Sequence, residues 1–197
     1  MPSIRDREII RRLAAETAEI AALPIQEEKR RLWRSLNGLR PERPMVTMDQ
    51  VCWNEMNVGD ELTLTCEDPE CRGYEDWLRR QLYQWRHFPV DMVVEPFVRV
   101  PKAIRNTGFG VGAKEHIAVT DPTNSVVGHA FENQFQTDAD LEKLQTPVIT
   151  HDPAETARRL EAAHALFDGT LRIVEWGFDP YLSVWDPISF WMSVEGA

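Results

Sequence analysis

A short apolar run between prolines and a cluster of polar side chains constrains the fold of this chain more than any other stretch. Pro41 and Pro44 end the preceding helical pattern, because proline lacks the N–H that a helix needs and favours extended geometry in the residue before it. The apolar residues within 45–48 are too few for a helix but sufficient for a strand covered on both faces. This pattern predicts a first strand over residues 43–50, with a polar loop at its carboxyl end.

Two helices are predicted before this strand. Ser3 is a suitable N-cap for the first helix, in which apolar residues recur at helical spacing. Pro24 separates it from a second helix over residues 26–36, which Gly38 would close with a left-handed C-cap. We therefore expect residues 1–40 to form a helical lead-in whose role is packing.

The rest of the chain alternates strand-like and helical patterns. A helix over residues 68–86 precedes the most strand-like run, at 92–100, and a helix over 154–167 precedes a buried strand at 171–177. Parallel strands joined through helices are typical of α/β folds, and their crossovers are right-handed. Within 104–135, two strand-like segments flank a turn and predict an inserted antiparallel hairpin.

Composition and charge exclude several classes of function. The chain has 22 Lys and Arg against 32 Asp and Glu, which gives a formal net charge of −10. This acidity disfavours non-specific binding to nucleic acid or to an anionic membrane. No apolar run approaches the roughly 20 residues that cross a bilayer, and an odd number of cysteines does not indicate a disulfide framework. We expect a cytoplasmic protein whose partners are neither nucleic acid nor membrane.

Candidate site residues gather just after the first predicted strand, where α/β proteins collect their chemistry. A carboxylate walled by an indole is desolvated, and desolvation raises its pKa towards that of a useful general acid. We therefore predict catalytic roles for Asp49 and Glu55, although Asp49 could instead only cap the following turn. The candidates for substrate binding in this loop are Gln50, Trp53 and Asn54.

Three more candidates lie later in the chain. His129 is the most interesting of the five histidines, because it lies on the inserted hairpin near Glu132, and such a hairpin would sit over the mouth of a barrel. Trp176 ends a predicted strand, a position equivalent to that of Asp49. We predict a catalytic role for His129 and substrate contacts for Glu132 and Trp176.

Metal and nucleotide motifs are weak in this sequence. Cys66 and Cys71 are not followed by a second pair of Cys or His at zinc-finger spacing, so no metal ligands are predicted. The glycines at 108, 110 and 112 lack the spacing of a dinucleotide fingerprint and lead into a predicted strand instead of a helix.

Several pieces of the sequence, in order, carry a resemblance to a known family. The chain resembles the uroporphyrinogen decarboxylase-like superfamily, in the branch related to corrinoid-dependent methyltransferases. Members of that superfamily are longer, so the chain resembles the N-terminal half of one. The pieces that carry the resemblance are residues 32–44, 49–50, 53–55, 138–144, 147 and 185–187.

This resemblance implies a fold, a reaction and partners. It implies that residues 41–197 form the first half of a (β/α)8 TIM-type barrel, incomplete by itself, with two N-terminal helices and an inserted β-hairpin. For the intact enzyme it implies corrinoid-linked methyl transfer from or to a small substrate. The corrinoid would be carried by a partner protein, and zinc would be bound only in the C-terminal half. Decarboxylation, or another lyase reaction of the same superfamily, is the enzymatic alternative.

One departure from the family bears on the substrate. The haem-pathway decarboxylase holds its substrate's carboxylates with an arginine-rich motif just after the first strand, whereas residues 50–53 here contain no arginine. This difference favours a smaller or less anionic ligand. A reading of another class is a non-catalytic half-barrel, which would need self-association or a complementary chain to cover its strand edges.

Overall fold

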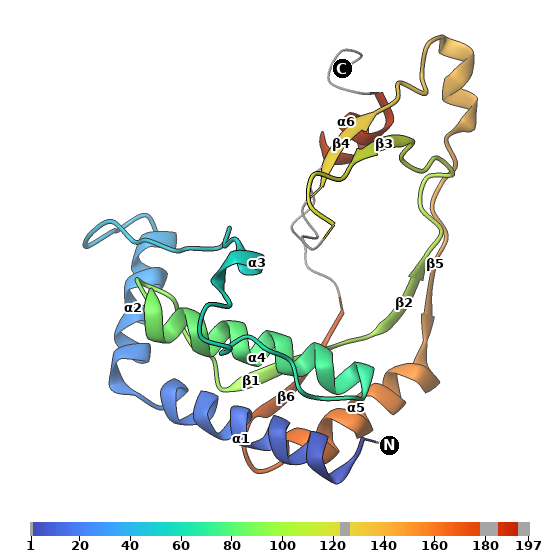
Figure 1. The fold of residues 1–197 in the computed structure, drawn as a ribbon. Coiled ribbons are helices and arrows are strands. Elements are labelled where there is room, and N and C mark those ends of the chain that lie inside the picture. Colours follow the sequence, from blue (N-terminus) through green and yellow to red (C-terminus); the bar gives the residue numbers. More distant parts are fainter. Residues whose placement is uncertain (1, 123–126, 178–184, 193–197) are drawn as a thin grey trace. The chain divides into compact units, whose positions relative to one another are not determined.

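The chain forms two compact units that contain both helices and strands (Figure 1). The computed structural model describes residues 2–122, 127–177 and 185–192. Unit 1 comprises Met1–Val100 and Arg158–Glu175, and unit 2 comprises Pro101–Ala157 and Trp176–Ala197. The predicted mixed α/β class is confirmed. The strands of the described ranges form three two-stranded sheets, and no closed barrel is present among them.

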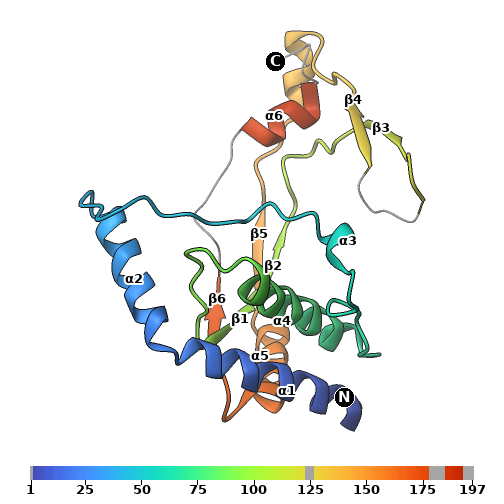
Figure 2. The same ribbon diagram turned by 60° about the vertical axis from the view of Figure 1, so that its left-hand side comes forward.

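Helices make up most of unit 1. Helices α1 and α4 lie side by side, as both ribbon views show (Figures 1 and 2). The sequence predicted four of these helices, and the structure confirms them. Their bounds are Ile4–Ala21 for α1, Pro24–Asn37 for α2, Trp53–Met56 for the short α3, Pro69–His87 for α4 and Pro153–Phe167 for α5, whose residues from Arg158 onwards belong to unit 1.

The core of unit 1 forms where α1, α4 and α5 meet the strands β1 (Phe97–Pro101) and β6 (Arg172–Trp176). Apolar residues three and four apart give α1 and α4 one buried stripe each. Removing these side chains from water is the main favourable term in folding. The core includes Ile10, Leu13, Leu78, Leu82, Val98, Val100, Leu166 and Phe167.

Strands β1 and β6 run parallel. At their amino ends the Arg172 N–H donates to the Pro96 carbonyl over 3.0 Å, and at their carboxyl ends the Lys102 N–H donates to the Trp176 carbonyl over 2.8 Å. Since α5 precedes β6, these three elements form a β–α–β unit, into which the chain inserts residues 102–152 after β1.

Two predicted strands are confirmed in unit 1, one of them in shortened form. The strand predicted at 171–177 is β6. The one predicted at 92–100 begins only at Phe97, because Pro96 has no N–H to give to a ladder.

The strand predicted over residues 43–50 is wrong, because residues 44–52 have no regular secondary structure. A backbone bond from the Asp91 N–H to the Val46 carbonyl, over 3.0 Å, links them to the segment before β1. The Val46 N–H donates to the Asp91 carboxylate instead of to a carbonyl, so no ladder forms. Val46 and Met48 are 52% and 43% exposed, whereas the prediction required burial on both faces.

The helix ends show which local signals are reliable. Ser3 caps α1 as predicted, since the Asp6 N–H donates to its hydroxyl over 3.0 Å. The predicted left-handed conformation of Gly38 is wrong, because Gly38 has a φ of −80° and Leu39 a φ of +58°. Leu39, directly after the C-cap Gly38, therefore takes the left-handed position that usually belongs to glycine.

Unit 2 is built from two antiparallel pairs. Strands β2 (Ala103–Asn106) and β5 (Ile149–Asp152) form one, and β3 (Glu115–Ala118) and β4 (Gly128–Phe131) form the other. The β3–β4 pair is the predicted hairpin, which is confirmed, whereas no strand was predicted at β5. A 3₁₀ helix at Asp138–Lys143 and α6 at Trp185–Met192 complete the described part of the unit.

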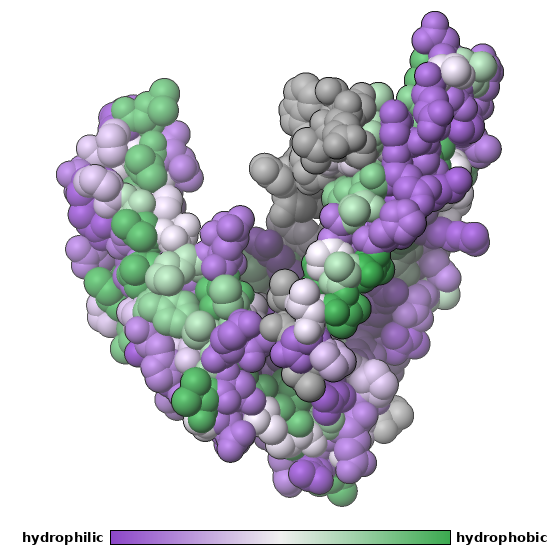
Figure 3. Space-filling view, turned by 45° about the horizontal axis from the view of Figure 1, so that its top comes forward, coloured by the Kyte–Doolittle hydropathy of each residue, from purple (hydrophilic) through white to green (hydrophobic). Residues whose placement is uncertain are grey.

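Few residues are buried in unit 2. Among its described residues whose exposure is known, only Ala103 and Thr156 are buried. Figure 3 shows apolar residues, in green, at the surface among hydrophilic ones. In unit 2 the exposed large apolar residues include Ile117, Val119, Leu141, Val148 and Ile149.

Candidate functional site

Five of the predicted site residues lie together in unit 1, on a segment that we call the site loop (residues 43–56). Asp49 and Gln50 are exposed in its irregular part, and Asn54 and Glu55 are exposed on α3. Trp53, also on α3, is partly buried. Because both predicted catalytic carboxylates are exposed, they lack the desolvation on which the expectation of a general acid depended.

Helix α4 holds the later part of the site loop. Arg80, Tyr83 and Gln84 lie on one face of α4, three and four residues apart. The Gln84 side-chain amide donates to the Met48 carbonyl over 2.6 Å. The Tyr83 ring meets Trp53 edge-on, with 6.2 Å between centroids, and the Arg80 guanidinium lies 5.3 Å from the Trp53 ring centroid.

Asp91, directly before the segment that leads into β1, holds the earlier part of the loop. Arg43 donates to both carboxylate oxygens of Asp91 over 2.8 and 2.6 Å, and the Val46 N–H donates to the same carboxylate over 2.9 Å. The Asp91 carbonyl in turn accepts a bond of 2.8 Å from the Trp33 indole of α2. The hydrogen bonds from Arg43 hold the pKa of Asp91 at about 2, although burial opposes this shift.

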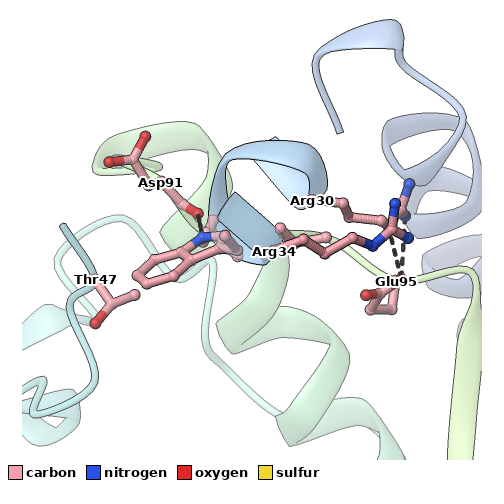
Figure 4. Close-up of a pocket in the computed structure, with 8 residues that line it drawn as sticks. Arg30, Arg34, Thr47, Asp91 and Glu95 are labelled. Carbon is pink, nitrogen blue, oxygen red and sulfur yellow. Dashed lines mark hydrogen bonds and ion pairs between the residues drawn. The ribbon is translucent and has the colours of Figure 1, made fainter. Parts of the chain in front are cut away.

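A groove of about 380 Å³ lies between α2 and the segment at 91–95. Its volume falls within the range of small-molecule sites, roughly 300–1,000 Å³. Figure 4 shows Arg30 beside Glu95, with which it forms an ion pair of 3.1 Å, and Thr47 at the opposite end of the groove. Thr47 is the residue of the site loop that lines the groove. The groove is lined by Arg30, Trp33, Arg34, Thr47, Asp91, Met92, Val93 and Glu95.

None of the residues that line the groove was predicted from the sequence to be a site residue. The charged side chains among them take part in ion pairs, which are Arg30 with Glu95, Arg34 with Glu27 and Asp91 with Arg43. An aspartate directly before an apolar run, as in Asp91-Met92-Val93-Val94, is a sequence signal that could have pointed to this region.

His129 and Glu132 lie on the hairpin of unit 2 but do not meet. His129 contacts Glu115 over 2.7 Å, and Glu132 contacts His116 over 3.0 Å. Successive residues of a strand point to opposite faces, so side chains three positions apart, such as these two, point to opposite sides. The structure therefore places the two candidates in two separate His–Glu pairs.

The remaining candidate, Trp176, ends β6. Its carbonyl accepts the Lys102 N–H, which places it at the carboxyl end of the parallel pair, as predicted for a strand-end residue. Trp176 belongs to unit 2, as do His129 and Glu132, whereas the site loop belongs to unit 1. The predicted site residues are thus divided between the two units.

The cysteines have no metal-binding arrangement in the described part of the chain. Cys66 and Cys71 are buried, and burial is the main cause that raises the pKa of each thiol to about 12. Across residues 2–122, 127–177 and 185–192, no group of three or more His, Cys, Asp or Glu side chains could hold a metal ion.

No helix within these ranges is long and apolar enough to cross a membrane. Comparison of the chain with family models, with curated proteins and with solved structures finds no match.

Proposed function

We propose that this chain supplies the first strands and the site loop of a β/α-barrel enzyme that acts on a small molecule. The observation that supports this proposal is the parallel β1–α5–β6 unit, because a parallel pair joined through a helix is the repeating element of such barrels. In this fold the catalytic groups follow the carboxyl ends of the strands. Lys102 and Trp176 occupy those ends here.

The proposed reaction is methyl transfer between a small substrate and a corrinoid carried by a partner protein. It follows from the sequence resemblance to the uroporphyrinogen decarboxylase-like superfamily. The exposed amide and carboxylate groups of the site loop suit the positioning of a small polar substrate in line with a reactive centre. Gln50 and Asn54 would orient it by hydrogen bonds, with Asp49 and Glu55 as acceptors. Any zinc ion of the intact enzyme would be bound by ligands outside this chain.

Methylcobalamin and a small thiol test this reaction. In the reaction, the thiol sulfur takes the methyl group from cobalt, the thiol loses its proton, and cob(I)alamin remains. We expect the corrinoid spectrum to change under anaerobic conditions faster with the protein than without it. Glu55→Gln should slow the change, and Glu19→Gln, which also removes one exposed carboxylate, should not. An unchanged spectrum with folded wild-type protein would reject methyl transfer and leave the lyase alternative.

A second candidate function is that of a chain that works only with a partner. The scarcity of buried residues in the described part of unit 2 favours it, because isolated two-stranded pairs are at best marginally stable in water. The partner would be a second copy or a complementary chain that covers these strands. Light scattering after size exclusion tests self-association, and a monomer at all concentrations would exclude it.

A further inference from the structure

We infer that Asp91 is a positioning residue for the site loop and fixes the loop in the geometry that a ligand would meet. The inference rests on the proposed function in assigning a binding role to this loop. Asp91 does not itself reach the predicted catalytic residues. Instead, it holds the chain at Arg43 and Val46, three or more residues before Asp49.

The loop needs such an anchor because it lacks other backbone support over its first part. Residues 44–52 form neither helix nor strand, and fixing each residue of an irregular segment costs conformational entropy. Hydrogen bonds to an ionised carboxylate are among the strongest that a protein makes. Asp91 accepts three of them from the loop.

Asp91 is itself held rigidly. It is 7% exposed, its N–H donates to the Val46 carbonyl, and its own carbonyl accepts the Trp33 indole N–H of α2. The backbone of Asp91 is therefore held by α2 through Trp33 and by the site loop through Val46. Gln84 and Trp53 provide the second attachment, so residues 49–52 lie between two fixed points.

Arg43→Gln is the sharpest test, because the Arg43 side chain is 45% exposed and its loss should not unfold the protein. We expect amide hydrogen exchange within residues 45–52 to become at least about tenfold faster, since a hydrogen bond to a charged group is lost. Arg31→Gln is the matched control. It removes another exposed arginine paired with a glutamate, Glu42, just before the loop, and it should leave exchange within 45–52 unchanged.

Rescue separates positioning from a general loss of stability. Arg43→Lys keeps a cation beside Asp91 and leaves the bond from the Val46 N–H to the Asp91 carboxylate in place, so we expect it to retain most of the protection lost in Arg43→Gln. Unchanged loop exchange in Arg43→Gln would overturn the inference, and so would faster exchange spread equally over α4.

Binding of methylcobalamin, followed by quenching of tryptophan fluorescence, connects the anchor to ligand binding. We expect Arg43→Gln to weaken this binding at least about tenfold, with Arg31→Gln unchanged. If the wild-type protein binds no methylcobalamin, the proposed function fails, while loop exchange still decides the anchoring role of Asp91. Equal affinity of wild type and Arg43→Gln would show that the anchor does not serve the ligand.

Discussion

Leu39 has a backbone conformation that its side chain disfavours. Its φ is +58°, and Arg40 and Leu39 donate backwards to the Ser35 and Leu36 carbonyls, which is the Schellman arrangement at a helix end. The left-handed conformation costs a residue with a Cβ roughly 1–2 kcal/mol, and glycine avoids this cost. The Leu39 residue is 90% exposed, so replacing it removes little packing.

We therefore expect Leu39→Gly to raise the free energy of unfolding by about 0.5–1 kcal/mol, after allowing for the greater flexibility of glycine in the unfolded chain. Chemical denaturation measures this change in the free energy of unfolding. Leu39→Ala is the matched control, because it removes the same exposed side chain but keeps the Cβ. An equal gain in both variants would assign the effect to the exposed leucine side chain and not to the backbone.

The three cysteines should differ sharply in reactivity. Cys52 is exposed on the site loop, whereas Cys66 and Cys71 are buried with pKa values raised to about 12, mainly by burial. The thiolate is the reactive form, and at pH 8 a thiol of that pKa is ionised only to about one part in ten thousand. Titration of the native protein with a thiol reagent should modify Cys52 alone, and all three cysteines in denaturant. Rapid modification of a second thiol in the native protein would contradict this packing.

At the scale of elements, the helices were predictable and the loops between them were not. A helix is specified by residues three and four apart and by caps such as Ser3 and Asp68, and all of these lie within one short stretch. A strand depends on a partner that the local sequence does not name. The apolar run at 45–48 therefore suggested a strand that the structure lacks, and β5, with the sequence Ile-Thr-His-Asp, was missed although it pairs with β2.

The candidate site was predictable to a similar extent. Asp49 to Glu55 lie close together because they are neighbours in sequence, although Trp53 to Glu55 form part of α3 instead of the predicted loop. The sequence paired His129 with Glu132 by proximity, whereas strand alternation directs them to opposite faces. The anchor at Asp91 could not be predicted, since it depends on contacts between residues far apart in the chain.

Residues 65 and 66, between the site loop and α4, are held by a buried carboxylate. Glu75 is fully buried and accepts bonds from the Thr65 and Cys66 N–H groups and from Arg79, over 2.8 to 3.1 Å. Burial alone would raise the pKa of Glu75, but these hydrogen bonds outweigh it, so the pKa lies below its ordinary value of 4.5. The ionised form therefore stabilises the fold above pH 4.5, and this contribution is lost as the pH falls through the lowered pKa.

We expect Glu75→Gln to lower the free energy of unfolding at pH 7 by roughly 3 kcal/mol, because Arg79 loses its buried partner. Below pH 4 the difference from the wild type should shrink, since protonation removes the same charge. Asp76→Asn, the adjacent residue on the surface of α4 with its own pair to Arg80, should cost less than about 1 kcal/mol. Urea unfolding at both pH values measures these effects. A difference independent of pH would show that charge is not the cause.

At the scale of the whole molecule, the uneven distribution of buried residues predicts uneven stability. The core of unit 1 draws on α1, α4, α5 and the parallel strands, whereas the strands of unit 2 form two-stranded pairs with mostly exposed side chains. Local opening needs little free energy where few apolar contacts are lost. We therefore expect amides of α4 to exchange only by global unfolding, and those of the β3–β4 hairpin to exchange by local opening.

Leu78→Ala, which removes a fully buried side chain of α4, distinguishes exchange by global unfolding from exchange by local opening. It should lower the free energy of unfolding by roughly 2–5 kcal/mol. Amide exchange in α1, α4 and the later part of α5 should become faster to the same extent, and exchange in the hairpin should not change. Ile117→Ala, at a 55% exposed position of β3, should leave exchange in unit 1 unchanged. Helix α6 contacts β4 through the rings of Phe190 and Phe131, whose centroids are 4.9 Å apart. If the wild-type hairpin proved as well protected as α4, something besides α6 would have to cover its strands in solution. That result would favour the partner-dependent function over an independent enzyme, because protection in a pair with exposed side chains has to come from outside the pair.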